Sequence, residues 1–131
     1  MGEKMDKILA EISAGELLDK ITILEIKKEK INNKEKLLEV NKELASLNET
    51  LKKFISDENK ILSYKNDLKN INLKLWDIED GKRSAEKNNK FDEKFIQLAR
   101  NVYKFNDERA RIKLAINNAL GSNIKEVKSY E

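Results

Sequence analysis

Apolar residues recur at alternating spacings of three and four along most of the chain, which is the period of an amphipathic α-helix. The pattern predicts four helices, at residues 14–32, 34–55, 57–87 and 92–120. Residues 1–12 carry a weaker, alternating pattern, and we expect them to form a short extended arm. The sequence therefore predicts an all-α fold, a bundle of about four long amphipathic helices arranged as antiparallel hairpins.

Two of the predicted helices carry a heptad seam, the coiled-coil-like pattern of helices that pack side by side. In the second helix the seam consists of Leu37, Val40, Leu44, Leu47, Leu51 and Phe54. In the third helix it consists of Ile61, Tyr64, Leu68, Ile71, Leu75 and Ile78. The first helix differs, because Ile23 and Ile26 lie outside its main apolar stripe. A helix with two apolar faces is either central in its fold or covered by a second subunit, and we expect a homodimer through this face.

Local signals mark the ends of these helices. Ser13 and Glu16 have the spacing of a capping box, in which each side chain binds a backbone N–H of the other's turn. Asp57 and Asp92 can cap the third and fourth helices, and Gly121 fits the left-handed position that ends the fourth. No internal repeat or linker interrupts the pattern, so we expect residues 1–131 to form a single domain.

Composition limits the chemistry that is open to this chain. Cysteine and histidine are absent from the 131 residues, which excludes disulfides, thiolate or imidazole metal sites and a histidine base. Catalysis would have to use carboxylates, lysine, arginine, hydroxyls or an oxygen-bound cation such as Mg²⁺. No apolar run is long enough to span a membrane, and the N-terminus lacks a signal-peptide core. We therefore expect a cytoplasmic protein.

Charge is nearly balanced, with 27 lysine and arginine residues against 24 aspartate and glutamate residues, a net +3. The excess lies in the last third of the chain, where basic and acidic residues alternate, which is typical of solvated helix faces. This balance argues against a nucleic-acid partner. Lysine outnumbers arginine 23 to 4, so the four arginines carry more information than the lysines.

Polar side chains interrupt the apolar face of the fourth predicted helix. Asn106, Arg109 and Lys113 lie one turn apart in the middle of that face, with apolar residues before and after them. Lys28 interrupts the stripe of the first helix in the same way. Inward cations need acidic partners or an anionic ligand, because burying an unpaired charge is costly.

A second polar stripe runs beside the seam of the third helix and consists of Asn72, Trp76, Glu79 and Arg83. Glu79 and Glu25 are the acids that we expect to face the inward cations. The candidate ligand-binding residues are Lys28, Trp76, Glu79, Asn106, Arg109 and Lys113. Two interpretations stay open, a closed ion-pair network and a pocket for an anion such as phosphate or carboxylate. Three inward cations against two acids slightly favour the pocket.

One further pattern concerns metal binding. Glu16 and Asp19 have the one-turn carboxylate spacing of helical Mg²⁺-dependent nucleotide hydrolases. Those enzymes need a second such pair on a facing helix, whereas Glu79 and Asp80 are adjacent and point in different directions. The capping box already accounts for Glu16. We therefore expect no metal and no cofactor.

Four segments resemble a family of short helical bacterial proteins classed as a domain of unknown function. They are SAGELLDKITILEIKKEKI (13–31), LWDIED (75–80), FIQLARNVYKFNDERARIKLAINNALGS (95–122) and the ending EVKSYE. Members tend to be associated with glycosyltransferase and cell-surface polysaccharide genes, so the resemblance implies that context but no activity. The family pattern is rich in polar residues, which favours a binding site: Glu16, Asp19, Lys20, Glu79, Asp80, Arg100, Tyr103, Asn106, Asp107, Arg109, Lys113 and Asn117.

A looser similarity, in arrangement only, is to the all-helical chorismate mutases, which hold a dicarboxylate between inward arginine and lysine side chains. Their arginine-rich first helix has no counterpart here. Two functions remain open, and with them the question of whether the protein is an enzyme. One is a non-catalytic, dimeric interaction module in surface-glycan assembly. The other is a small enzyme or binding protein that holds an anionic metabolite in the bundle interior through Arg109, Lys113 and Lys28.

Overall fold

The computed structural model describes residues 6–125 and Val127. It contains α1 (Ala14–Lys30), α2 (Lys34–Phe54), α3 (Glu58–Lys87) and α4 (Glu93–Leu120). The all-α prediction is confirmed, and each predicted helix boundary lies within two residues of the observed one. The expectations for the first five residues and for the ending EVKSYE lie outside the described residues, apart from Val127.

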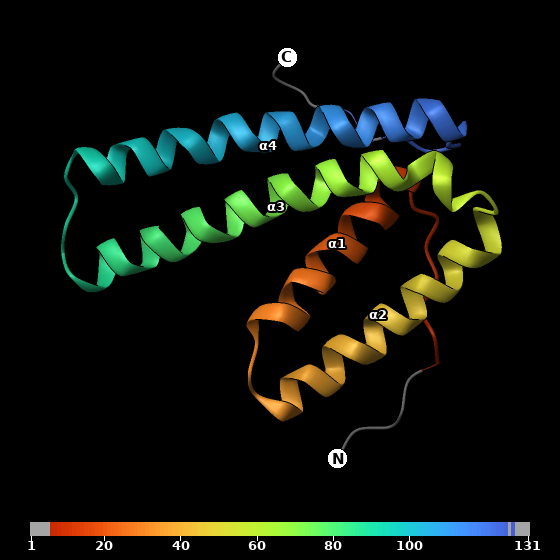
Figure 1. The fold of residues 1–131 in the computed structure, drawn as a ribbon, viewed down its shortest axis with the longest axis horizontal. Coiled ribbons are helices and arrows are strands. Elements are labelled where there is room, and N and C mark those ends of the chain that lie inside the picture. Colours follow the sequence, from red (N-terminus) through yellow and green to blue (C-terminus); the bar gives the residue numbers. More distant parts are fainter. Residues whose placement is uncertain (1–5, 126, 128–131) are drawn as a thin grey trace.

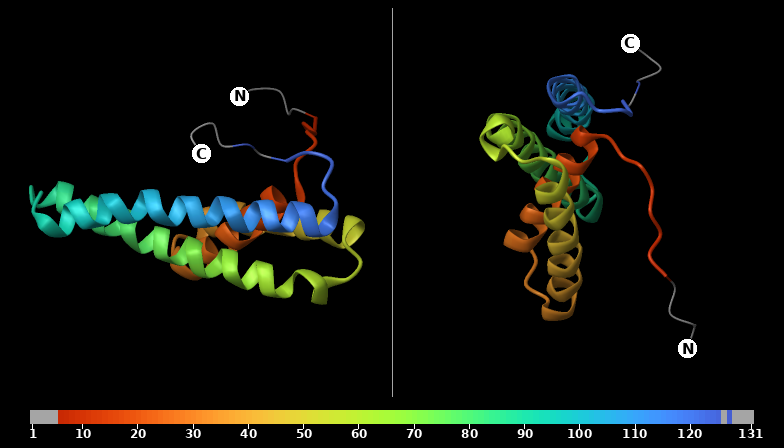
Figure 2. Two further views of the ribbon diagram at one scale, coloured as in Figure 1. Left: turned by 90° about the horizontal axis from the view of Figure 1, so that it is seen from above. Right: turned by 90° about the vertical axis from the view of Figure 1, so that its right-hand side faces the viewer.

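The four helices form two antiparallel hairpins, α1–α2 and α3–α4 (Figure 1). The α1–α2 hairpin crosses the α3–α4 hairpin and projects to one side of it (Figure 2). The end of the α3–α4 hairpin that carries residues 88–92 extends beyond α1 and α2 (Figure 1). Because α1 packs against α2, α3 and α4, it is the central helix of the fold.

The hydrophobic core draws on all four helices and follows the predicted seams. Its buried members are Leu17, Leu18, Ile21, Leu24, Val40, Leu44, Leu51, Ile61, Leu68 and Ile116. Phe54 is the exception, since its side chain is 73% exposed. It is the last residue of α2 and borders a hollow instead of a neighbouring helix. The expected seam of α2 is therefore wrong at its final position.

The second apolar face of α1 is partly covered by α3 and α4 of the same chain. Ile26 is 1% exposed, and Ile23 is half-buried beside residues of α3 and α4. Part of the apolar surface that predicted a homodimer is thus covered by the chain's own helices, and the homodimer itself stays a prediction. Of the two explanations for a helix with two apolar faces, α1 follows the first, because other helices of the same chain pack on both faces.

The helix ends follow the predicted signals. The Ser13 hydroxyl accepts from the Glu16 backbone N–H at 3.1 Å, and Asp57 and Asp92 each accept a backbone N–H of the first turn that they cap. Gly121 ends α4 with φ +63°, in the left-handed region that favours glycine. Side-chain caps of this kind satisfy backbone donors that have no partner inside the helix. The helix starts are thus encoded locally.

Gly15 sets the position of α1 on α4. A Cβ atom at this residue would lie only 2.5 Å from the Lys113 carbonyl oxygen, so no side chain fits there. The close approach lets the Gly15 N–H donate to Asn117 Oδ1 at 2.7 Å. Because the two helices are antiparallel, the next polar residues of α1 then face the preceding turns of α4.

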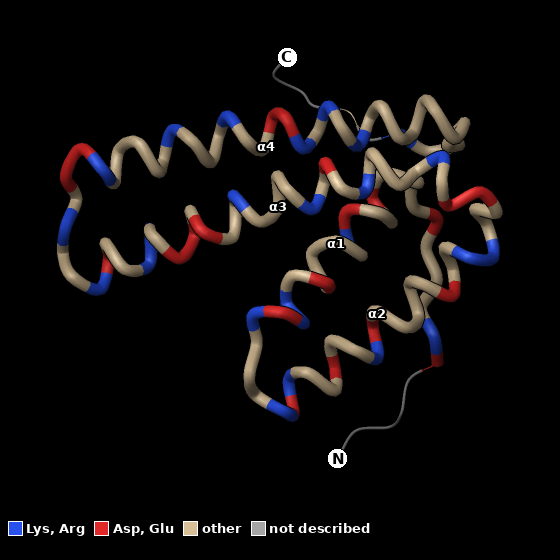
Figure 3. The backbone as a smooth tube through the Cα atoms, in the orientation of Figure 1, with Lys and Arg blue, Asp and Glu red and all other residues tan. Residues whose placement is uncertain are grey.

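Charges of both signs are distributed along all four helices; they are nearly balanced in α1, α2 and α3, whereas basic residues outnumber acidic ones in α4 (Figure 3). Among the described residues, no helix has the length and apolar composition needed to cross a membrane.

Candidate functional site

A ladder of polar contacts joins α1 to α4 beyond the Gly15 contact. Lys113 Nζ donates to Glu16 Oε2 at 2.7 Å, and one turn further along α1 the Arg109 guanidinium binds the Asp19 carboxylate. The inward cations of α4 thus meet acids of α1, with Lys113 only 7% exposed. These acids are the pair with one-turn spacing, and each of them faces a cation of α4.

Asp19 is the most enclosed charge of the site, with 1% exposure. Its Oδ1 accepts from Arg109 Nε at 2.9 Å and from Asn72 Nδ2 at 2.9 Å, and its Oδ2 accepts from Arg109 Nη2. Asn72 Nδ2 also donates to Thr22 Oγ1 at 3.0 Å. Two parallel hydrogen bonds between a guanidinium and a carboxylate fix the plane of both groups. Arg109 is therefore held in one orientation.

The acids predicted to face the inward cations are the wrong ones. Glu25 pairs with Lys65 of α3 at 3.3 Å, and Glu79 pairs with Lys82 at 3.4 Å. Asp19 and Glu16 take their place, because the close contact at Gly15 turns that side of α1 towards α4. The capping box is thus used in one direction, since the Glu16 carboxylate contacts Lys113.

Lys28 is exposed, and the expectation that it faces inward is wrong. It lies in the last turn of α1, where Lys27 and Lys30 are also found. Cations in this position complement the negative end of the helix dipole and stay in water. With Lys28 outside, two inward cations meet two acids. The charge excess that favoured an anion in the bundle interior is therefore absent.

A cleft of about 340 Å³ opens beside Arg109, at the junction of α1, α3 and α4. The predicted polar stripe of α3 lines it, and α4 contributes two further polar side chains. We call it the three-helix cleft; its lining consists of Ile23, Ile26, Asn72, Leu75, Trp76, Glu79, Arg83, Asn106 and Arg109. Four of the six predicted binding residues are thus brought together, Trp76, Glu79, Asn106 and Arg109, while Lys28 and Lys113 lie outside the lining.

Three residues that were not among the six predicted binding residues hold the site in place. Asp19 and Thr22 of α1 and Asn72 of α3 form the buried network behind Arg109. The signal for Asp19 was its one-turn spacing from Glu16, which also fits two acids facing cations on an adjacent helix. Thr22 has no comparable signal, because a hydroxyl within an apolar helix face has many uses.

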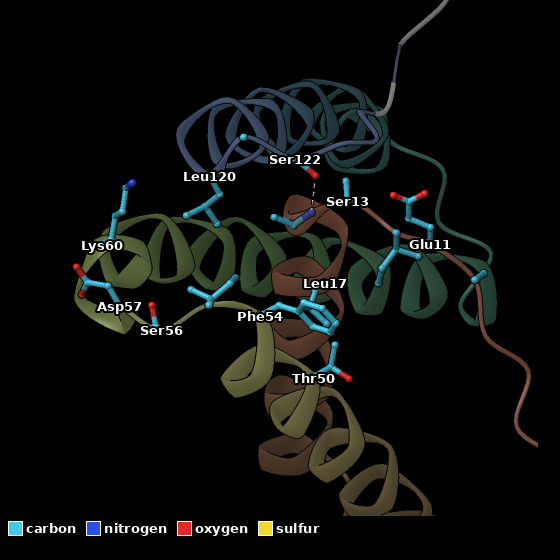
Figure 4. A pocket seen from close by; sticks show the side chains of 15 residues that line it. Glu11, Ser13, Leu17, Thr50, Phe54, Ser56, Asp57, Lys60, Leu120 and Ser122 are labelled. Atoms are coloured by element: carbon cyan, nitrogen blue, oxygen red, sulfur yellow. Dashed lines mark hydrogen bonds between the residues drawn. The ribbon is translucent and has the colours of Figure 1, made fainter.

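A second and larger hollow, of about 730 Å³, lies at the start of α1 and the ends of α2 and α4 (Figure 4). Leu17, Phe54 and Leu120 supply apolar lining, and Lys60 and Asp57 lie at one end of it (Figure 4). A helix start usually attracts anions, because its first N–H groups lack partners. Here these donors are occupied.

The donors at the start of α1 are satisfied by the chain itself. The Ala14 N–H donates to Ser122 Oγ at 3.0 Å (Figure 4), and the Gly15 N–H donates to Asn117 Oδ1. The Glu16 N–H donates to Ser13 Oγ. An anion in the larger hollow would have to displace these caps, so the three-helix cleft is the better candidate site.

The fold and the cleft define a small all-helical protein in which a buried ion-pair network supports a polar cleft between three helices. The chain belongs to DUF6165, a family of unknown function, whose model matches residues 8–131. The resemblance to a domain family without assigned activity is confirmed to that extent. Neither a curated protein nor a solved structure matches the chain.

Proposed function

We propose that the protein is a non-catalytic helical binding module that holds a small polar ligand in the three-helix cleft. One observation carries this proposal: side chains from three helices, four of them candidates on sequence grounds, line a single cleft. The fixed guanidinium of Arg109 forms part of the lining. Small-molecule sites generally combine an apolar lining with a few polar groups held in place.

The acids around the cleft support binding over catalysis. Among the described lining residues Glu79 is the one carboxylate, and it lies 3.4 Å from Lys82 Nζ. Acid–base catalysis on a substrate needs a group that accepts a proton and one that donates it. Two further acids contact lining residues: Asp19 is buried and binds Arg109 through both oxygens, and Asp80 pairs with Arg83.

We further propose that this module works in surface-glycan assembly, which is the context that the resemblance of the sequence implies. That setting makes sugars and sugar phosphates the first ligands to test. It also fits a module that delivers or senses a glycan precursor for a partner enzyme.

A specific observation favours a second candidate, a module for an anionic metabolite in the same cleft. Arg83 and Arg109 are two of only four arginines among 27 basic residues, yet both line this cleft. Arginine binds carboxylates and phosphates with two parallel hydrogen bonds, which lysine cannot do. The anion would lie at the surface between the helices, not in the bundle interior.

The protein carries a built-in reporter for both candidates, because Trp76 is its single tryptophan. Ligand binding in the cleft should change the Trp76 fluorescence and raise the unfolding temperature. A ligand present at 100 times its dissociation constant stabilises the folded state by about 2.7 kcal/mol. Sugars, sugar phosphates, inorganic phosphate and dicarboxylates are the probes. If none of them changes either signal in the intact protein, the binding function is wrong.

A further inference from the structure

Each charged side chain that lines the three-helix cleft already has an oppositely charged partner outside the lining. Arg109 binds Asp19, Arg83 Nη1 lies 3.1 Å from Asp80 Oδ1, and Glu79 lies 3.4 Å from Lys82. The formal charges of these pairs sum to zero. The cleft therefore offers little net attraction to an ion, and least to one with two negative charges.

Two uncharged polar groups of the cleft, in contrast to its charged groups, have no hydrogen-bond partner in the part of the chain that the structure describes. Among the described residues, neither the Asn106 amide nor the Trp76 indole N–H forms a hydrogen bond. Both side chains are half-buried. An amide supplies donors and an acceptor at once, and an indole supplies one donor beside a large apolar ring. Such groups suit a ligand that carries hydroxyls next to an apolar face.

A dianion would also have to compete with the buried network. Asp19 already binds the Nε and Nη2 edge of Arg109, so a dianion would have to use the other edge of the guanidinium. There it would lie close to the carboxylate of Asp19, and the two like charges would repel each other. A single carboxylate on the ligand has a better partner in Arg83, whose side chain is 72% exposed at the rim of the cleft.

The volume of the three-helix cleft also favours a small ligand. The volume of about 340 Å³ is at the lower end of the range of about 300–1,000 Å³ for small-molecule sites. One sugar ring suits this volume better than a nucleotide sugar with its base, two phosphates and two rings.

We propose that the ligand of the three-helix cleft is one sugar ring, uncharged or with a single carboxylate, and this rests on the binding function proposed above. The apolar C–H face of the ring packs on Trp76. Its hydroxyls bind the Asn106 amide and the Glu79 carboxylate, and a carboxylate, where present, binds Arg83.

The test compares free sugars with phosphates on the intact protein. The probes are glucose, galactose, mannose, N-acetylglucosamine, rhamnose and glucuronate, against inorganic phosphate and glucose 1-phosphate at matched ionic strength. Trp76 fluorescence and thermal unfolding are the two readouts. We expect at least one free sugar to bind with a Kd at least tenfold below that of inorganic phosphate. We also expect the added phosphate of glucose 1-phosphate to weaken binding relative to glucose.

Matched variants locate the bound sugar. Asn106→Ala should raise the Kd for the sugar at least tenfold, whereas Asn118→Ala, an exposed asparagine of the same helix outside the cleft, should change it less than twofold. Arg83→Gln should weaken glucuronate and spare uncharged sugars, and Arg100→Gln should affect neither. Trp76→Leu, followed by thermal unfolding, should abolish the ligand-induced shift.

Three results would overturn the sugar inference. Phosphates that bind tenfold more tightly than every free sugar would leave a binding cleft but assign it to anions. Sugar binding that survives both Asn106→Ala and Trp76→Leu would place the sugar elsewhere. A lack of response to every probe would overturn the binding function together with the sugar.

Discussion

Asp19 of α1 and Arg109 of α4 form a two-bond ion pair in which the carboxylate is 1% exposed and the guanidinium faces a cleft. This pair connects the interior to the candidate site, because the same contact that neutralises a buried charge also orients a lining residue. Its loss should therefore affect both stability and ligand binding.

Arg109→Met should destabilise the protein by about 3–5 kcal/mol, because it leaves Asp19 buried without its cation. The double variant Asp19→Leu/Arg109→Met should be less destabilised than Arg109→Met, since no charge then remains unpaired. Urea unfolding of both single variants and the double variant gives the coupling energy. A loss below about 1 kcal/mol for Arg109→Met would show that Asp19 has another adequate partner or becomes hydrated.

Gly15→Ala should destabilise the protein by about 1–3 kcal/mol, the usual cost of forcing extra atoms into a packed contact. The added Cβ would lie 2.5 Å from a backbone oxygen of α4, which cannot rotate away. Gly81→Ala is the matched control, because this helical glycine would meet the flexible Leu98 side chain at 3.0 Å. Alanine favours a helix over glycine by about 1 kcal/mol, so Gly81→Ala should be neutral or stabilising in thermal unfolding.

The ion pair between Glu29 and Lys69 should contribute to stability in a way that depends on pH. The hydrogen bond from Lys69 lowers the pKa of the Glu29 carboxyl below 4.5 and raises the pKa of the Lys69 amine above 10.5. A lowered carboxyl pKa gives a contribution that is present above pH 4.5 and is lost as the pH falls through the folded-state pKa.

Glu29→Gln tests this pair. The variant should be slightly less stable than the parent near pH 7, and the difference should disappear in acid and shrink at high salt, because the pair is exposed. Urea unfolding at several pH values measures the difference. A gap between the two proteins that persists at acid pH would mean that Glu29 acts through packing and not through its charge.

The helices could be predicted from the sequence because their signals are local. Caps such as Ser13 and Asp92 and the repeated apolar positions act within one helix, whatever packs against it. The polar stripe of α3 and the Arg109 face of α4 were predictable for the same reason, since a helical projection shows which residues share a face.

The partners across helices could not be predicted in this way. A projection does not say which residues lie opposite, and that depends on the crossing of α1 over α4 at Gly15. Asp19 therefore meets Arg109, whereas Glu79 stays with its own helix. The prediction for Lys28 was wrong because a helical projection ignores the position along the helix. Lys28 is exposed in the last turn of α1, although it shares a face with buried residues of the earlier turns.

Three cations, each predicted to face inward, should now differ in what their loss costs. Arg109→Met should be the most damaging, because the carboxylate that it leaves is buried. Lys113→Met should cost about 1 kcal/mol, since its partner Glu16 is 31% exposed and has Lys20 at 3.7 Å as a second cation. Lys28→Met should be within about 0.5 kcal/mol of the parent, as is usual for surface positions. Thermal unfolding of the three variants under one condition gives the ranking. If Lys28→Met proved as damaging as Lys113→Met, Lys28 would have to face the interior of the protein or bind an acidic partner, and the last turn of α1 would not lie in water.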